Sequence, residues 1–290
     1  MPGGTDPAPE SPPGMAATIP AASAPASPPA AATMTPPPAG AATVLQILTY
    51  NVAGLPQGLS SSQPQVNTPL ISPKLNPFQL ALVQEDFWYH AQLVSAATHP
   101  FKSTPMPNAS PTDLGDGLNV LSRVAFTDLA RTKWTKCNGT FDQKSDCLTS
   151  KGFVRFVIDL GGGKTVDVYD AHFDAGRSTG DATARDAQVT QIADAIAAQS
   201  AGKALIVAGD TNMNADDEAT FQKLLTTTGL TDACRALSCA EPARYDRVMF
   251  RSSASVKLSA KSWHVESFVD AAGNPLSDHD PVSVEVSIAP

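Results

Sequence analysis

Ser277-Asp278-His279-Asp280-Pro281 stands directly before Val282-Ser-Val-Glu-Val-Ser-Ile288, a run in which apolar and polar residues alternate. Alternation with a period of two predicts a β-strand, so an acid and a histidine lie at the mouth of this strand. Matching polar residues stand at the ends of other apolar, strand-like runs along the chain: Asn51, Glu85, His172, Asp210, Asn212 and Asp246. This repetition predicts one site assembled from several strand ends.

The beginning of the chain differs in composition from the rest. Of the 290 residues, the first 42 are almost entirely Ala, Pro, Ser, Thr and Gly and include no aromatic residue. Prolines recur through this stretch and interrupt every possible helix or strand. We therefore expect a flexible tail or linker over residues 1–42, and one large α/β domain over residues 43–290.

The formal net charge of −8 lowers the expectation of a partner held by a broad basic surface. Stable binding of nucleic acid and tight docking on an anionic membrane both need such a surface. No segment approaches the ~20 apolar residues of a membrane helix. A local contact to one phosphate, through a metal ion and histidines, remains open.

The four cysteines form two pairs that are close in sequence, Cys137 with Cys147 and Cys234 with Cys239. Neither pair has the spacing or the nearby histidine of a metal site. Two local disulfides are the favoured interpretation and four free thiols the alternative, and disulfides predict a secreted or otherwise extracytoplasmic protein. Residues 1–42 lack the basic start and unbroken apolar stretch of a signal peptide.

Strand-like runs exceed helical ones. We expect strands over residues 44–48, 80–83, 118–121, 125–129, 152–160, 165–171, 204–208, 247–250, 256–258 and 282–288, with Gly161-Gly-Gly163 as a hairpin turn. Helical spacing covers residues 87–97, 181–199 and 216–227, and residues 52–77 and 100–117 read as loops. Hairpins mixed with helical crossovers predict two mixed β-sheets packed face to face, with helices outside.

Each candidate residue also has a structural interpretation. Asp210 and Asn212 would share one side of an extended backbone, where the acid could orient water and the amide could bind a phosphoryl oxygen, but Gly-Asp-Thr-Asn also suits a turn. Glu85 suits Mg²⁺, or the start of a helix. A lone histidine is usually structural, whereas His172 and His279 both stand at strand ends and could transfer protons near neutral pH.

Together these motifs resemble the endonuclease/exonuclease/phosphatase superfamily, whose members include DNase I, apurinic endonucleases, inositol polyphosphate 5-phosphatases and bacterial sphingomyelinases. Ser277–Pro281, Gly209-Asp210-Thr-Asn212 and Gln84-Glu85 occur in the order found in that family. The resemblance spans about Thr43 to Ile288. It implies a four-layered α/β sandwich and a metal-dependent phosphoric ester hydrolase.

The resemblance also implies roles for the metal ligands and the base. Glu85 would ligate Mg²⁺ with Asn51 beside it, and Mn²⁺ or Ca²⁺ could replace that ion. His279 would be the general base that deprotonates the attacking water, and Asp246 would orient its ring. Asp278 would complete the acidic wall near the metal and the histidine.

The remaining residues would act on the substrate. Asp210 would position the nucleophile, Asn212 would bind a non-bridging phosphate oxygen, and His172 would contact the phosphate and assist the leaving group. The implied reaction is in-line attack of water on phosphorus, with the cation offsetting the growing negative charge.

Two segments look like parts of the bacterial sphingomyelinase branch: residues 145–153 with Lys151-Gly-Phe153, and Ala171-His172-Phe173-Asp174-Ala175. We therefore expect a secreted, monomeric phosphodiesterase that cleaves a phospholipid headgroup, sphingomyelin in particular, without a stable nucleic-acid partner. Secreted sphingomyelinases often insert a hairpin with exposed aromatic residues before the final Asp-His. Here the stretch from Phe250 to Ser277 is short, and Trp263 and Phe268 could be either membrane contacts or core residues.

Two other functions stay open. A DNase I-like endonuclease would need cationic side chains around the site, and no basic cluster stands out among the available arginines: Arg123, Arg155, Arg177, Arg185 and Arg247. A non-catalytic binding module on the same fold is the second alternative, although such a module has no need for this set of acids and histidines.

Overall fold

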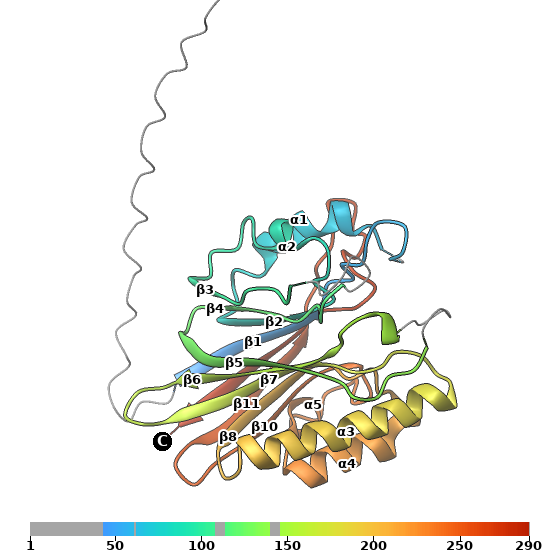
Figure 1. Cartoon of the computed structure of the whole chain (residues 1–290). Helices are drawn as coiled ribbons and strands as arrows, with labels where there is room; N and C mark the ends of the chain where they lie inside the picture. The colour runs from blue at the N-terminus through green and yellow to red at the C-terminus, as the bar shows by residue number, and fades with distance from the viewer. Residues whose placement is uncertain (1–42, 61, 108–113, 140–145, 290) are drawn as a thin grey trace, which may run out of the picture. The chain divides into compact units, whose positions relative to one another are not determined.

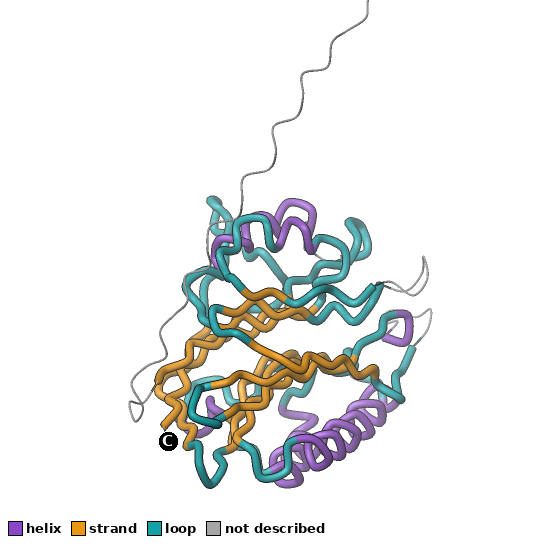
Figure 2. The backbone as a smooth tube through the Cα atoms, turned by 60° about the vertical axis from the view of Figure 1, so that its left-hand side comes forward, coloured by secondary structure: helices purple, strands orange, loops and turns teal. Residues whose placement is uncertain are grey.

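Two six-stranded β-sheets lie face to face in the computed structural model, which describes residues 43–60, 62–107, 114–139 and 146–289. Helices cover the outer face of each sheet, so the layers run helix, sheet, sheet, helix (Figures 1 and 2). This arrangement confirms the predicted four-layered α/β sandwich. The tail expected over residues 1–42 lies outside the described residues.

The first sheet, sheet A, has the strand order β11-β12-β1-β2-β4-β3. β1 and β2 are parallel, and all other neighbours in this sheet are antiparallel. Val282 of β12 pairs with Thr49 of β1, so the start of β12 lies beside the end of β1. The strands are β1 (Thr43–Asn51), β2 (Leu80–Gln84), β3 (Phe101–Lys102), β4 (Asn119–Ser122), β11 (Lys257–Val265) and β12 (Val282–Ala289).

The second sheet, sheet B, has the order β5-β6-β7-β8-β10-β9. β7 and β8 are parallel, whereas the other neighbours are antiparallel, including the hairpin of β6 and β7 that the glycine-rich turn predicted. The strands are β5 (Phe126–Lys133), β6 (Gly152–Asp159), β7 (Thr165–His172), β8 (Ala204–Asp210), β9 (Thr231–Asp232) and β10 (Asp246–Arg251).

The helices divide between the two outer faces. α1 (Pro64–Lys74) and α2 (His90–Leu93) lie over sheet A, while α3 (Thr179–Gln199) and α4 (Glu218–Thr228) lie over sheet B (Figure 1). α5 (Ala233–Ala236) follows β9, and single 3₁₀ turns span Asp146–Leu148 (η1) and Ala215–Asp217 (η2). α3 begins at a capping box, in which the side chains of Ser178 and Asp181 each accept a hydrogen bond from the other's backbone N–H.

Alternation along the strands fills the gaps between the layers. Ile47 faces the other sheet, and its neighbour Leu48 faces the helices outside sheet A. Large apolar side chains from both sheets, such as Leu82, Phe156 and Ile206, form the central cluster. Because this packing fixes the register of the strands, it also fixes where each strand ends.

The structure differs from the predicted elements in several places. β3 lies in the expected loop over residues 100–117, and β5 extends to Lys133, beyond the expected residues 125–129. β9 and α5 were not predicted. The expected loop over residues 52–77 contains α1, which includes Pro69 and Pro73. The helix expected over residues 87–97 is reduced to α2, because the preceding segment is hydrogen-bonded to the loop after β1. The short strand expected over residues 256–258 extends to Val265, as β11.

The aromatic residues of the stretch from Phe250 to Ser277 pack on the domain. Phe268 is buried, with its ring centroid 5.3 Å from that of Tyr50, and Trp263 on β11 packs partly buried against the central cluster. This favours the core interpretation of both residues over the membrane contact.

Both expected cysteine pairs are joined, Cys137 to Cys147 and Cys234 to Cys239. The first bridge closes the chain between β5 and β6, and the second closes the end of α5. In the described part of the chain, every helix is too short or too polar to cross a bilayer.

Candidate active site

The strand ends that carry the candidate residues meet at one edge of the sandwich. His172 is paired with Asp210 across the parallel strands β7 and β8, and Asp246 is paired with Asp210 from the antiparallel strand β10. In sheet A, Asn51 is paired with Gln84, the residue before Glu85. Strand register alone therefore places these side chains in two groups, one in each sheet.

One amide joins the two sheets. The Nδ2 atom of Asn51 donates to Oε1 of Glu85 at 3.1 Å and to Oδ2 of Asp210 at 3.1 Å. The Oδ1 atom of Asn51 accepts from the backbone N–H of Ala53 at 3.0 Å, which fixes the orientation of the amide. Asn51 is thus a donor between two carboxylates in this structure.

Both histidines approach Asp210. The Nδ1 atom of His279 lies 2.8 Å from Oδ2 of Asp246, and its Nε2 atom lies 3.7 Å from Oδ2 of Asp210. The Nε2 atom of His172 lies 3.4 Å from the same Asp210 oxygen and 3.8 Å from Oε1 of Glu85. Within the part of the chain that the structure describes, neither ring nitrogen of buried His172 has a hydrogen-bond partner. Such orphan nitrogens call for a partner from a ligand or water.

A tight turn after β8 positions the amide of Asn212. This residue has φ of +51°, so it turns back instead of continuing the extended strand that we predicted. Its Nδ2 atom donates to the carbonyl of Phe173 at 3.0 Å and lies 3.2 Å from Oδ2 of Asp210. Asn212 is therefore part of a turn, and its amide nevertheless lies beside Asp210, as expected for a shared site. Gly209 allows β8 to lie close to the backbone of β7, since a Cβ at this position would lie 1.9 Å from the carbonyl oxygen of Ala171.

The segment before β12 is tied to the end of β1. The Oγ atom of Ser277 donates to the carbonyl of Asn51 at 2.7 Å and accepts from the backbone N–H of His279 at 3.2 Å. Asp278 is exposed, and its charge raises the pKa of Glu85. The serine of the Ser277–Pro281 motif therefore serves to place the histidine.

Burial dominates the electrostatics of the acids and of His172. Burial raises the pKa of Glu85, against the nearby charge of Lys151, and raises the pKa of Asp246 to about 6. Burial and the charge of Lys151 hold the pKa of His172 well below 6.5. His172 is therefore neutral at physiological pH.

His279 behaves in the opposite way. Burial lowers its pKa, but the carboxylates of Asp210, Asp246 and Asp278 together outweigh burial and raise the pKa to about 10. Without a cation in the site, His279 is thus held protonated by its acidic surroundings.

The donors suit a hard cation. Glu85 offers carboxylate oxygens with 20 % of the side chain exposed, in a site whose other acids repel its charge. Ligand atoms of Asp210, Asp246 and His279 also lie within 4.8 Å of one another. The Nδ1 atom of His279 is already hydrogen-bonded to Asp246, so this nitrogen is not available to a cation in the present geometry, whereas carboxylate oxygens such as those of Glu85 are ligands that suit a hard cation.

Two residues without a predicted role also belong to this neighbourhood. Lys151 is buried, its Nζ atom lies 2.5 Å from Oδ1 of Asp146, and its pKa is raised because three nearby carboxylates outweigh burial. Arg177 donates to the carbonyl of Asn212 at 2.9 Å and stacks on Tyr245, whose ring centroid lies 6.4 Å from that of His279. From the sequence, Arg177 was only one of five available arginines, whereas Lys151 stands in a segment already likened to the sphingomyelinase branch.

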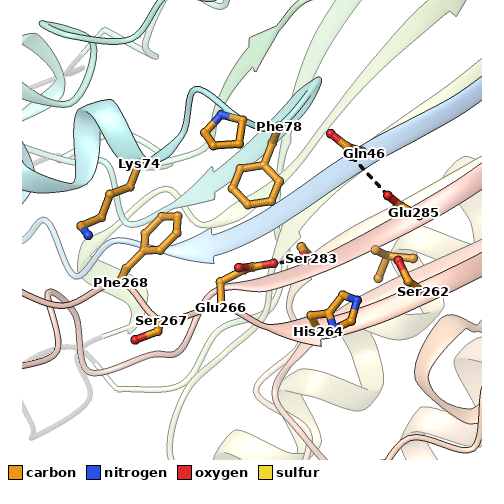
Figure 3. A pocket seen from close by; sticks show the side chains of 12 residues that line it. Gln46, Lys74, Phe78, Ser262, His264, Glu266, Ser267, Phe268, Ser283 and Glu285 are labelled. Carbon is orange, nitrogen blue, oxygen red and sulfur yellow. Dashed lines mark hydrogen bonds between the residues drawn. The ribbon is translucent and has the colours of Figure 1, made fainter.

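Other candidates lie outside the site. Arg185 is buried and binds Asp217 together with the carbonyls of Asp174 and Gly176, so it organises loops. His99 is buried against the carbonyl of Phe78. His264 lines a groove of about 390 Å³ on the outer face of sheet A, and no lining residue of that groove belongs to the candidate site (Figure 3).

The chain has the fold of the endonuclease/exonuclease/phosphatase, or DNase I-like, proteins. A Beutenbergia cavernae protein described as endonuclease/exonuclease/phosphatase matches the structure with a TM-score of 0.56 at 14% identity, over 85% of this chain and 72% of that chain. No protein-family model matches the chain.

Within that class the chain is similar to mycobacterial sphingomyelinases. It is 37% identical to the sphingomyelinase of Mycobacterium tuberculosis over 261 residues. This aligned region covers 82% of this chain and 51% of the relative. The chain therefore spans about half the length of the curated relatives it matches. Beta toxin from Staphylococcus aureus, in a crystal structure with bound magnesium ions, matches with a TM-score of 0.62 at 17% identity, over 83% of this chain and 99% of that chain.

Proposed function

We propose that residues 43–290 form a metal-dependent phosphodiesterase in which a water molecule activated by His279 attacks phosphorus. The convergence of residues from distant parts of the sequence supports this most directly. Glu85, His172, Asp210 and His279 come from both sheets, yet neighbouring pairs of their polar atoms lie 3.4 to 3.8 Å apart. Among the described residues, both ring nitrogens of buried His172 lack a hydrogen-bond partner, which supports a bound ligand at this position.

The proposed cation is Mg²⁺, with Mn²⁺ or Ca²⁺ as substitutes, held by Glu85 with Asn51 beside it. When bound, it would neutralise negative charge that develops on the phosphoryl and leaving oxygens. The carboxylate of Glu85 would supply oxygen ligands to such an ion, and a carboxylate oxygen of Asp210 lies across the shared amide of Asn51. Asp210 and other acids nearby raise the pKa of His279, so offsetting their charge favours the neutral imidazole that a general base requires.

His279 takes the proton from water in this proposal, and Asp246 holds the ring through the 2.8 Å contact at Nδ1. This contact leaves Nε2 to face the reacting water. Asp278 adds negative charge next to the imidazolium that forms after proton transfer, which raises the pKa of His279 further.

The other residues would hold the phosphoryl group. Asp210 orients the attacking water. Asn212 would bind a non-bridging oxygen by exchanging one of the two hydrogen bonds that its Nδ2 atom donates to Phe173 and Asp210. His172 is neutral, so one of its two buried ring nitrogens carries a proton, which it would donate to the phosphate or to the leaving oxygen. Uncharged donors at fixed positions stabilise charge that develops in the transition state.

We propose a phospholipid headgroup, as in sphingomyelin, as the substrate class. Similarity to sphingomyelinases over 82% of this chain supports it. The endonuclease alternative receives less support, because four of the five arginines considered are engaged away from the site: Arg123 with Asn76 and Thr98, Arg155 with Asp167, Arg185 with Asp217, and Arg247 with Asp232. The paired cysteines support an extracytoplasmic location, and we propose that the protein acts as a monomer.

A substrate panel with one variant tests this function. At fixed Mg²⁺, with an EDTA control, we expect the wild type to hydrolyse sphingomyelin and bis-p-nitrophenyl phosphate and to leave plasmid DNA and an inositol phosphate largely intact. His279→Ala should reduce turnover by about 10²–10⁴-fold while the circular dichroism spectrum is retained. Unchanged turnover in this variant would reject His279 as the base. If the wild type preferred plasmid DNA over sphingomyelin, the protein would be a nuclease and the lipid substrate would be rejected. No turnover of any substrate would favour the binding module.

A further inference from the structure

Exposed apolar side chains lie on two segments whose backbones are hydrogen-bonded to each other beside Glu85, and we call these side chains the rim. The rim is made of Leu59 in the loop after β1, and Trp88 in the segment after β2. Their exposed fractions are 72% and 55%, which is unusual for side chains of this size. α1, which follows the loop, adds Val66 and Leu70, one turn apart and also exposed.

Hydrogen bonds join the rim to the residues proposed to hold the cation. The backbone N–H of Gly54 donates to the carbonyl of Glu85 at 3.0 Å, and that of Trp88 donates to the carbonyl of Gly54 at 3.2 Å. The backbone N–H of Gln57 donates to Oη of Tyr89 at 2.9 Å. A Cβ on Gly54 would lie 2.4 Å from the carbonyl oxygen of Glu85, so the close approach depends on glycine. The segments that carry Leu59 and Trp88 are thus the segments that place Asn51 and Glu85.

The charge pattern identifies the kind of surface that the rim fits. From Val52 to Pro73 the sequence contains no Asp, Glu, Lys, Arg or His, although charged residues make up 17% of the chain. An anionic membrane is bound by clusters of Lys and Arg, which the rim lacks and which the net charge of −8 further disfavours. Tryptophan and leucine on an uncharged surface suit the interface of a bilayer with neutral headgroups.

We propose that Leu59 and Trp88, with Val66 and Leu70 beside them, dock the enzyme on a zwitterionic phospholipid bilayer. The proposal rests on the proposed function in one respect, the phospholipid substrate. Insertion of the rim would bring the mouth of the site to the headgroup layer, so a lipid phosphodiester could reach Glu85 and Asp210 without leaving the membrane. The aromatic membrane contact considered for Trp263 and Phe268 is then supplied by a different part of the chain.

Vesicle binding tests the rim without turnover. In EDTA, we expect the wild type to bind phosphatidylcholine vesicles, and Leu59→Ser/Trp88→Ala to bind roughly tenfold more weakly or worse, because two exposed apolar side chains lose their insertion energy. Leu237→Ser is the matched control, since Leu237 is also exposed, at 38%, but follows α5 beside sheet B. This control should bind as the wild type does.

Tryptophan fluorescence reports insertion directly. Trp88 is exposed, whereas Trp134 is buried and Trp263 is half-buried, so a blue shift on addition of vesicles should come mainly from Trp88. Trp88→Phe keeps an apolar ring and should still bind vesicles, but the shift should disappear. A shift of unchanged size in Trp88→Phe would contradict insertion of Trp88.

Hydrolysis of the soluble bis-p-nitrophenyl phosphate separates docking from chemistry. Leu59→Ser/Trp88→Ala should keep this activity within about twofold while losing vesicle binding. The docking proposal would be overturned if Leu59→Ser/Trp88→Ala bound vesicles as tightly as the wild type. It would also be overturned if the wild type bound only vesicles that contain phosphatidylglycerol, or if the wild type were a dimer that the two substitutions dissociate. Wild-type vesicle binding without hydrolysis of any phosphodiester would instead refute the proposed function and leave the docking surface standing.

Discussion

Asp210 connects the groups that face one another at the edge of the two sheets. Its Oδ2 atom lies within 3.1 to 3.7 Å of polar atoms of Asn51, Asn212, His172 and His279. Sequence patterns predicted all of these residues as site candidates, since each stands at the end of a strand-like run. They could not predict the positive φ of Glu85 and Asn212, +59° and +51°, because such conformations depend on tertiary contacts at the turn.

The pair of His279 and Asp246 carries a prediction for the metal-free protein. The folded-state pKa of about 10 for His279 exceeds the unfolded value of about 6.5. Protonated His279 therefore stabilises the fold fully below about pH 6.5, and this contribution is lost as the pH rises through about 10. Asp246→Asn removes one of the charges responsible, so we expect the unfolding free energy of the variant to fall less between pH 6.5 and 10 than that of the wild type.

Urea unfolding in EDTA at several pH values measures this difference, and NMR titration of His279 should show a lower pKa in Asp246→Asn. The pKa of Asp246 is itself raised, from 3.8 to about 6, so its protonation changes the unfolding free energy between about pH 3.8 and 6, below the range that concerns His279. Parallel stability curves above pH 6.5 for the two proteins would show that Asp246 does not hold the charge on His279.

Among the elements, buried strands were the most predictable from sequence. The runs that form β2 and β8 are short and apolar and end in polar residues, whereas β12 alternates and follows a polar segment. α1 was missed because Pro69 and Pro73 usually end a helix, yet Ile71 and Ser72 are buried against sheet A and tertiary packing outweighs propensity. β11 was cut short because its residues after Leu258 are mostly polar and half-exposed.

The junction of α4 and α5 provides a second prediction. Arg235 donates two hydrogen bonds of 2.8 Å to the carboxylate of Glu218, and these bonds lower the pKa of Glu218 to about 2. Because the side chain of Glu218 is 46% exposed, solvent screens the pair, and Glu218→Gln should cost no more than about 1 kcal/mol at pH 7. The contribution is fully present above about pH 4.5 and is lost as the pH falls through about 2.

Thermal or urea unfolding of Glu218→Gln and the wild type at pH 7 and near pH 2 tests this pair. An equal loss of stability at both pH values would show that the effect does not come from the negative charge of Glu218.

For the whole molecule, cation binding should be coupled to stability. A ligand that binds only the folded state at about 100 times its Kd stabilises by about 2.7 kcal/mol, so saturating Mg²⁺ should raise Tm. Glu85→Gln removes the main proposed ligand and should abolish both this increase and the hydrolysis. Glu266→Gln is a matched control, because Glu266 binds Ser283 beside the groove on the outer face of sheet A and should keep the increase. An Mg²⁺-dependent increase of Tm in Glu85→Gln equal to that of the wild type would move the cation site elsewhere.

Asn51 donates hydrogen bonds to Glu85 in one sheet and to Asp210 in the other. The candidate site therefore needs residues from both sheets. A sliding of the sheets by less than one residue spacing would separate the reacting groups while every strand stayed intact. The proposed hydrolytic activity should therefore depend on the alignment of the two sheets. On heating, we expect activity to be lost at a lower temperature than the secondary structure measured by circular dichroism.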